Sequence, residues 1–201
     1  MTDDAGRRTQ EQRRAETERR VVDAATELIA TSGSRRITLA QVGEAAGYSR
    51  GIVYHQFGSR ERLVEAVLDK VQRMELPAYE GNGLEQLVGV VETYLAVVSQ
   101  RAPSTRAFLQ LWLEALAADP VVAPLFAERD RGFRRWLSDV VARGIADGTV
   151  VRDAVPDGAG ALLIAIVRGS SVQMAASPEV DAASVTAEAV RVVRAAFAAP
   201  G

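Results

Sequence analysis

Few residues of this 201-residue chain are suited to catalytic or metal chemistry. The sequence has no cysteine and a single histidine, His55, which argues against a thiol nucleophile, a disulfide, a histidine-based metal cluster and a catalytic triad. Three acidic residues, Glu114, Asp119 and Glu128, are spaced as solvated acids on a helix face, and we identify no partner for them. We therefore predict no catalytic residue, no metal site and no cofactor.

The distribution of arginine points to a different kind of chemistry. The whole chain has a net charge of −2. Between residues 31 and 60, however, four arginines oppose one acid, so the local charge is +3: Arg35, Arg36, Arg50 and Arg60 against Glu44. DNA affinity depends on the field at the contact face, so one basic patch is sufficient. Arginine can grip phosphate or guanine with two hydrogen bonds, although a GC-rich genome explains the arginine bias equally well.

The residues around this basic segment predict a helix-turn-helix. Thr38 and Gln41 have the spacing of a capping box, which starts one short helix. Gly47 and Tyr48 form a tight turn, and Ser49 is a suitable N-cap for a second short helix that ends near residue 56. Such a pair can place its second helix in the major groove of DNA, although many helical hairpins bind nothing.

The remainder of the chain predicts an all-α fold of about nine helices. A helix from about Arg14 to Gly33 precedes the pair, and one opened by Ser59 follows it. Pro77 and the glycines at 81 and 83 mark a boundary, which gives a flexible arm (1–13), a DNA-binding domain (14–76) and a second domain (77–201). Apolar spacing predicts five helices in the second domain, near 84–100, 104–117, 121–147, 157–176 and 179–198.

No membrane segment or secretory signal is predicted. The most continuous apolar run, residues 159–167, is far shorter than the ~20 residues that span a bilayer. The N-terminus is polar and charged where a signal would be apolar. We expect a soluble, cytoplasmic protein.

The segment from Ile37 to Leu63 resembles the signature of the TetR family of transcriptional regulators. The resemblance covers about 27 contiguous residues. Its first half consists of a threonine that opens the second helix, Thr38, and an alanine-glycine turn, Ala46-Gly47. Its second half consists of a Ser-x-Gly-x-x-Tyr-x-x-Phe run from Ser49 to Phe57 and a Ser-basic-Glu-x-Leu start to the fourth helix from Ser59 to Leu63. The resemblance implies a DNA-binding helix-turn-helix followed by a helical domain for ligand binding and dimerisation.

The resemblance also implies roles for individual residues. Arg50 and Gly51 are placed at the front of the recognition helix, where an arginine can make a bidentate contact to guanine. Tyr54 is placed where the family uses an aromatic hydroxyl on a base or a phosphate. Thr38 and Arg60 are placed at phosphate-clamp positions, at the starts of the second and fourth helices.

Other residues of this region have weaker or alternative assignments. Ser49 belongs to the predicted contact set, and Gln56, which replaces a common histidine or tyrosine of the family, can still bind a phosphate. His55 is either a DNA contact or an ordinary surface residue. The arginines of the arm either reach DNA or belong to a solvated segment: Arg7, Arg8, Arg13 and Arg14. Five residues are predicted as core: Ala45, Ala46, Val53, Phe57 and Leu63.

The C-terminal half resembles, more loosely, BetI-like and actinobacterial TetR-like regulators. Candidate walls of an effector pocket are its aromatic residues and one methionine, with ordinary core packing as the alternative: Phe108, Trp112, Phe126, Phe133, Trp136 and Met174. They favour an apolar effector. The resemblance implies a homodimer through the last two helices (157–176 and 179–198) and a repressor that an effector releases from a palindromic operator. The alternatives are an activator, a ligand-independent regulator, a helical enzyme or a protein-docking module.

Overall fold

Nine α-helices account for most of the residues that the structure describes. The computed structural model describes residues 10–72 and 81–200, and within these ranges one 3-10 turn (Ser34–Arg36) and no strand accompany the helices. The helices are α1 (Gln10–Ser32), α2 (Leu39–Ala46), α3 (Arg50–Phe57), α4 (Arg60–Gln72), α5 (Gly83–Ser99), α6 (Pro103–Leu116), α7 (Val122–Asp147), α8 (Pro156–Ala176) and α9 (Ala182–Phe197). The predicted all-α fold is confirmed.

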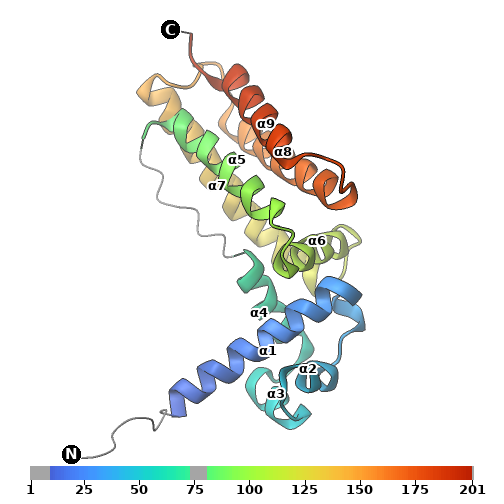
Figure 1. Ribbon diagram of the computed structural model, residues 1–201. Coiled ribbons are helices and arrows are strands. Elements are labelled where there is room, and N and C mark those ends of the chain that lie inside the picture. The colour runs from blue at the N-terminus through green and yellow to red at the C-terminus, as the bar shows by residue number, and fades with distance from the viewer. Residues whose placement is uncertain (1–9, 73–80, 201) are drawn as a thin grey trace, which may run out of the picture.

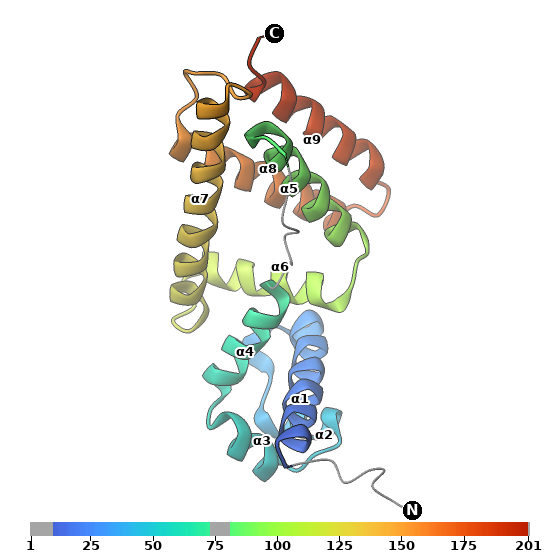
Figure 2. The ribbon, with the colours of Figure 1, turned by 90° about the vertical axis from the view of Figure 1, so that its left-hand side faces the viewer.

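The molecule is elongated, with two groups of helices at its two ends. Helices α1 to α4 form one end, and α5, α7, α8 and α9 form the other (Figure 1). Helix α6 lies across the middle, which is clearest in the perpendicular view (Figure 2). Helix α6 is therefore placed to contact both groups.

Local capping interactions define the helix-turn-helix. The Thr38 hydroxyl accepts a hydrogen bond from the Gln41 amide at 3.2 Å, and the Gln41 side chain accepts one from the Thr38 amide at 2.9 Å. Gly47 has φ 76°, a left-handed conformation that glycine adopts without strain. Ser49 then caps α3 by accepting from the Ile52 amide at 3.3 Å. The predicted capping box, turn and N-cap are all confirmed.

Two hydrophobic cores hold the fold together. The first is formed by α1 to α4 and also includes Ala107 and Leu111 from α6 and Val122 and Phe126 from α7. The second is formed by α5, α7, α8 and α9. The core of the DNA-binding helices thus extends beyond the boundary that we placed near residue 77.

Three details of the sequence-based prediction differ from the structure. Helix α1 begins at Gln10, so residues 10–13 are helical and do not belong to a flexible arm. Ala45 is exposed, contrary to its assignment as core. Helix α9 begins at Ala182 because the Asp181 side chain caps it. Arg7, Arg8 and Pro77 lie outside the described residues.

Helix α8 is long and largely apolar. It is the single helix in the described ranges that is long and apolar enough to cross a membrane by length and composition, and 39% of its apolar window is buried inside the protein. It packs against α5, α7 and α9 and carries the buried charge of Arg168.

Two glycines allow α5 and α7 to cross in direct backbone contact. A Cβ built on Gly83 would overlap the backbone N and Cα of Gly144, and a Cβ on Gly144 would overlap the Val150 side chain. We expect Gly83→Ala to lower the free energy of unfolding by about 1–3 kcal/mol, because the two helices must move apart. Urea denaturation measures this change.

Gly132 provides the matched control. It lies inside α7, and a Cβ built there meets nothing within 4 Å. Gly132→Ala should therefore stabilise the protein by about 0.4–1 kcal/mol through reduced freedom of the unfolded chain. Equal losses in the two variants would show that the close crossing at Gly83 is not the cause.

Candidate nucleic-acid interface

Helix α3 buries one face and leaves the other open to solvent. Val53 and Phe57 are buried in the core of the N-terminal helices. Arg50, Gly51 and Tyr54 are exposed, and Tyr54 is 60% exposed although its side chain is large and aromatic. Ile52 and His55 are exposed as well. The predicted readout residues therefore share one solvent-facing surface of the second helix of a helix-turn-helix.

Three other predicted contact residues already take part in hydrogen bonds within the protein. The Thr38 hydroxyl is exposed but belongs to the capping box, and the Ser49 hydroxyl caps α3. The Gln56 side chain donates to Glu18 of α1 at 3.0 Å. The Gln56 amide has a second N–H that could donate to a phosphate, and its DNA role stays a prediction.

Arg60, the predicted clamp of α4, is directed toward the protein. Its Nε donates to the Ser34 carbonyl oxygen at 2.9 Å, and one of its terminal nitrogens donates to the same oxygen. The side chain is only 25% exposed. In the structure Arg60 therefore supports the turn between α1 and α2, and its contact with phosphate stays a prediction.

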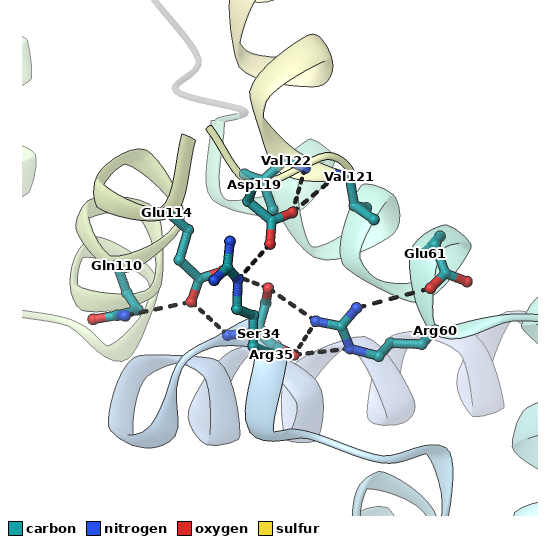
Figure 3. Close-up of polar contacts among 9 residues, drawn as sticks. All are labelled: Ser34, Arg35, Arg60, Glu61, Gln110, Glu114, Asp119, Val121 and Val122. Carbon is teal, nitrogen blue, oxygen red and sulfur yellow. Dashed lines mark hydrogen bonds and ion pairs between the residues drawn. The ribbon is translucent and has the colours of Figure 1, made fainter. Parts of the chain in front are cut away.

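The same turn is held from the other side by α6 (Figure 3). The carboxylate of Glu114 accepts hydrogen bonds from the Ser34 amide at 2.8 Å and from the Ser34 hydroxyl at 2.5 Å. The Arg35 Nε donates to Asp119 at 2.6 Å, beyond the end of α6. The description of Glu114 and Asp119 as solvated acids without partners is therefore wrong. Both acids connect the C-terminal helices to the DNA-binding helices.

Asp119 is held in its charged form although it is only 4% exposed. Burial raises its pKa, but hydrogen bonds from Arg35 and from the amides of Val121 and Val122 outweigh burial, so the pKa lies below its usual value. The two amides lie 2.9 and 3.0 Å from the carboxylate. Asp119 thus orients Arg35 and the start of α7 together.

The six candidate residues of an effector pocket fall into two groups. Phe108, Trp112 and Phe126 pack with the core of the N-terminal helices, and the Phe108 and Phe126 ring centroids lie 5.6 Å apart. The others pack with the C-terminal core: Phe133, Trp136 and Met174. The six residues therefore do not belong to one cluster, and their role as pocket walls stays a prediction.

A charged cluster that the sequence analysis missed lies between these two groups. Arg168 of α8 is 8% exposed, and its terminal nitrogens donate to the two carboxylate oxygens of Asp130 at 2.6 and 2.5 Å. Its guanidinium lies 5.5 Å from the Trp112 ring centroid. Its Nε is buried and has no hydrogen-bond partner among the described residues. An arginine in the middle of a long, largely apolar helix is the signal that could have revealed this cluster.

Tyr94 of α5 completes the cluster. Burial raises the pKa of its phenol, and the positive charge of Arg168 beside it acts in the opposite direction. Four helices, α5 to α8, therefore each contribute one polar or aromatic side chain to this place in the fold.

Comparison with known proteins agrees with this architecture. The family model for bacterial regulatory proteins of the tetR family matches residues 21–67, and the model for the C-terminal region of BetI-type transcriptional repressors matches residues 83–199. The chain is 26% identical over 136 residues to the regulator SrpR of Pseudomonas putida, which covers 66% of this chain and 63% of SrpR. It thus spans less than two thirds of that relative.

Two further proteins are similar over a larger share of their length. The regulator BetI of Cronobacter sakazakii is 26% identical over 159 residues, which covers 68% of this chain and 79% of BetI. A transcriptional regulator of Saccharomonospora viridis, solved in complex with choline, has the same fold with a TM-score of 0.76 at 19% identity, covering 92% of this chain and 100% of that one.

A helix-turn-helix with an exposed second helix, followed by five further helices, is the architecture of a DNA-binding transcriptional regulator. The two family models together match most of the chain. The chain belongs to the TetR family of transcriptional regulators, which are not enzymes.

Proposed function

We propose that this protein is a cytoplasmic homodimeric repressor that binds a palindromic operator and leaves it when a small molecule binds the C-terminal helices. The exposed face of α3, with Arg50, Gly51 and Tyr54, carries the DNA part of the proposal. Arg50 at the first turn of the helix can donate two hydrogen bonds to guanine in the major groove. Two such helices, one DNA turn apart, would read the two halves of a palindrome.

The apolar outer surface of α8 and α9 supports a dimer. Leu162 is 51% exposed and Val192 is 43% exposed, although both are large and apolar. Gly169 lies on the same side of α8, and a Cβ built there would meet open space, so a second helix can approach closely. A second copy of the chain would cover these residues through a self-complementary contact.

The cluster around Arg168 supports an effector site between α5, α6, α7 and α8. Its buried Nε is a donor without a partner, which a ligand oxygen could satisfy. The face of an aromatic ring such as Trp112 would suit a quaternary ammonium, for example the choline of the Saccharomonospora viridis complex. In this protein, however, the Arg168 guanidinium already occupies the face of Trp112. We therefore propose an effector with an apolar body and a hydrogen-bond acceptor.

The proposal is tested by measuring DNA binding with Arg50→Ala. Fluorescence anisotropy compares the DNA upstream of the gene with a scrambled duplex at moderate salt. Arg50→Ala should lose about 1–3 kcal/mol of affinity per half-site on the specific duplex and little on the scrambled one. The control is Arg152→Ala, which removes an exposed arginine from the C-terminal half.

Two outcomes would change the proposal. If folded wild-type protein does not prefer its upstream DNA to the scrambled duplex, operator binding is refuted. If it binds but raises transcription from that promoter in a purified system, the protein is an activator. Release by a ligand is tested separately, by adding candidate effectors to the wild-type complex.

A further inference from the structure

A groove lies beside the recognition helix, between the first turns of α1 and the exposed side of α3. Its volume is about 480 Å³. It is lined from α1 by Arg13, Arg14 and Thr17, and from α3 and its cap by Ser49, Gly51 and His55, with no acidic residue among its lining. The groove therefore combines two guanidinium groups and two hydroxyl groups at the edge of the predicted DNA-reading surface.

The two arginines of the groove are not used within the described part of the chain. Both side chains are exposed, and neither makes a hydrogen bond or ion pair with another described residue. The next arginines of α1 are engaged, because Arg19 binds Glu16 at 3.0 Å and Arg20 lies 5.3 Å from the Tyr48 ring centroid. Within α1, the free positive charge thus gathers at the end that lies beside α3.

The shape of the groove and the position of the Glu18 carboxylate also suit the close approach of a phosphate backbone. A Cβ built on Gly51 would meet only the Ser49 hydroxyl, at 3.8 Å, so the surface of α3 is open at this point. The Glu18 carboxylate of α1 accepts a hydrogen bond from Gln56 and does not belong to the lining of the groove. A helix fixes Arg13 and Arg14, so ordering them on an anion costs less entropy than ordering a flexible arm.

We propose that this groove binds the sugar-phosphate backbone of operator DNA, with Arg13 and Arg14 as phosphate contacts. The inference rests on the proposed function, because it assumes that α3 enters the major groove. An element beside a recognition helix then meets the strand that borders the groove, where most protein–DNA hydrogen bonds go to phosphate and carry no sequence information. The sequence allows the arginines of the arm either to reach DNA or to belong to a solvated segment, and the proposal assigns Arg13 and Arg14 to DNA.

The test is the salt dependence of DNA binding by Arg13→Gln and Arg14→Gln. Each phosphate contact contributes a slope of about −0.9 to log K against log salt concentration. Each variant should therefore reduce the steepness by about one per bound subunit, and its affinity at 0.1 M salt should fall about eightfold per subunit, a factor of about 10 to the power 0.9. Arg19→Gln removes the same charge from the same helix, but from an existing ion pair, and should leave the slope nearly unchanged.

The measurement is made on both the upstream duplex and a scrambled duplex. If the slope falls equally on the upstream duplex and on the scrambled duplex, the result supports phosphate contacts. Unchanged slopes for Arg13→Gln and Arg14→Gln, or losses no larger than that of Arg19→Gln, overturn the proposal. A loss confined to the upstream duplex also overturns it, because the arginines would then read bases. In each case wild-type binding shows whether the proposed function itself holds.

Discussion

Asp130→Ala is expected to lower the free energy of unfolding by about 2–4 kcal/mol. The change removes the carboxylate that binds both terminal nitrogens of Arg168 and leaves that cation buried without a counterion. Breaking a fully buried ion pair costs about 3–5 kcal/mol. We expect slightly less here because the Asp130 side chain is 31% exposed, so water screens part of the interaction. Urea denaturation at neutral pH measures the loss.

Two further variants separate this effect from a general effect of changing α7. Asp139 is an exposed acid on the same helix, and Asp139→Ala should change stability by no more than about 0.5 kcal/mol. Adding Arg168→Met to Asp130→Ala should recover much of the loss, because an apolar side chain needs no counterion. If the double variant is as unstable as Asp130→Ala alone, the unpaired charge is not the cause.

Glu114→Ala is expected to cost about 2–4 kcal/mol and to weaken the connection between the two ends of the molecule. Ser34 is fully buried, and both its amide and its hydroxyl donate to the Glu114 carboxylate. Hydrogen bonds to a charged acceptor contribute about 1.5–3 kcal/mol each, and buried donors left without partners are unfavourable. Chemical denaturation measures the loss of stability.

Glu114→Gln and Glu128→Ala are the matched comparisons. Glutamine keeps one acceptor oxygen in place, so its loss should be roughly half that of alanine. Glu128 is an exposed acid of α7 and should tolerate alanine with little change. A tolerated Glu114→Ala would mean that water satisfies Ser34 and that this contact does not hold the turn between α1 and α2.

The sequence predicted those parts of the fold that depend on neighbouring residues. The capping box of Thr38 and Gln41 and the N-cap of Ser49 each join residues three apart, so their spacing is visible in the sequence. The helix boundaries of the C-terminal half follow from prolines, glycines and apolar spacing in the same way. The early start of α1 was missed because its first turns are charged and have no apolar face, although arginine and glutamate favour helices.

Contacts between distant parts of the chain could not be predicted in this way. Ser34 and Glu114 are 80 residues apart, and Asp130 and Arg168 are 38 apart. Each acid has the spacing of an ordinary surface residue on its own helix, and only the packing of α6, α7 and α8 supplies its partner. The exposed readout residues of α3 were predicted from the family resemblance, whereas the groove beside them required the position of α1.

Helix α6 contributes to the hydrophobic core of the DNA-binding helices and lies between them and the C-terminal helices (Figure 2), so it can transmit a movement from one group to the other. Trp112, beside Arg168, and Glu114, which holds Ser34, are two residues apart on this helix. In the proposed function, a ligand that displaces Arg168 and moves α6 would therefore also move the support of the turn before α2. The influence of such a ligand on operator binding would be limited by how differently it binds the operator-bound and the released conformations, however tightly it binds either one.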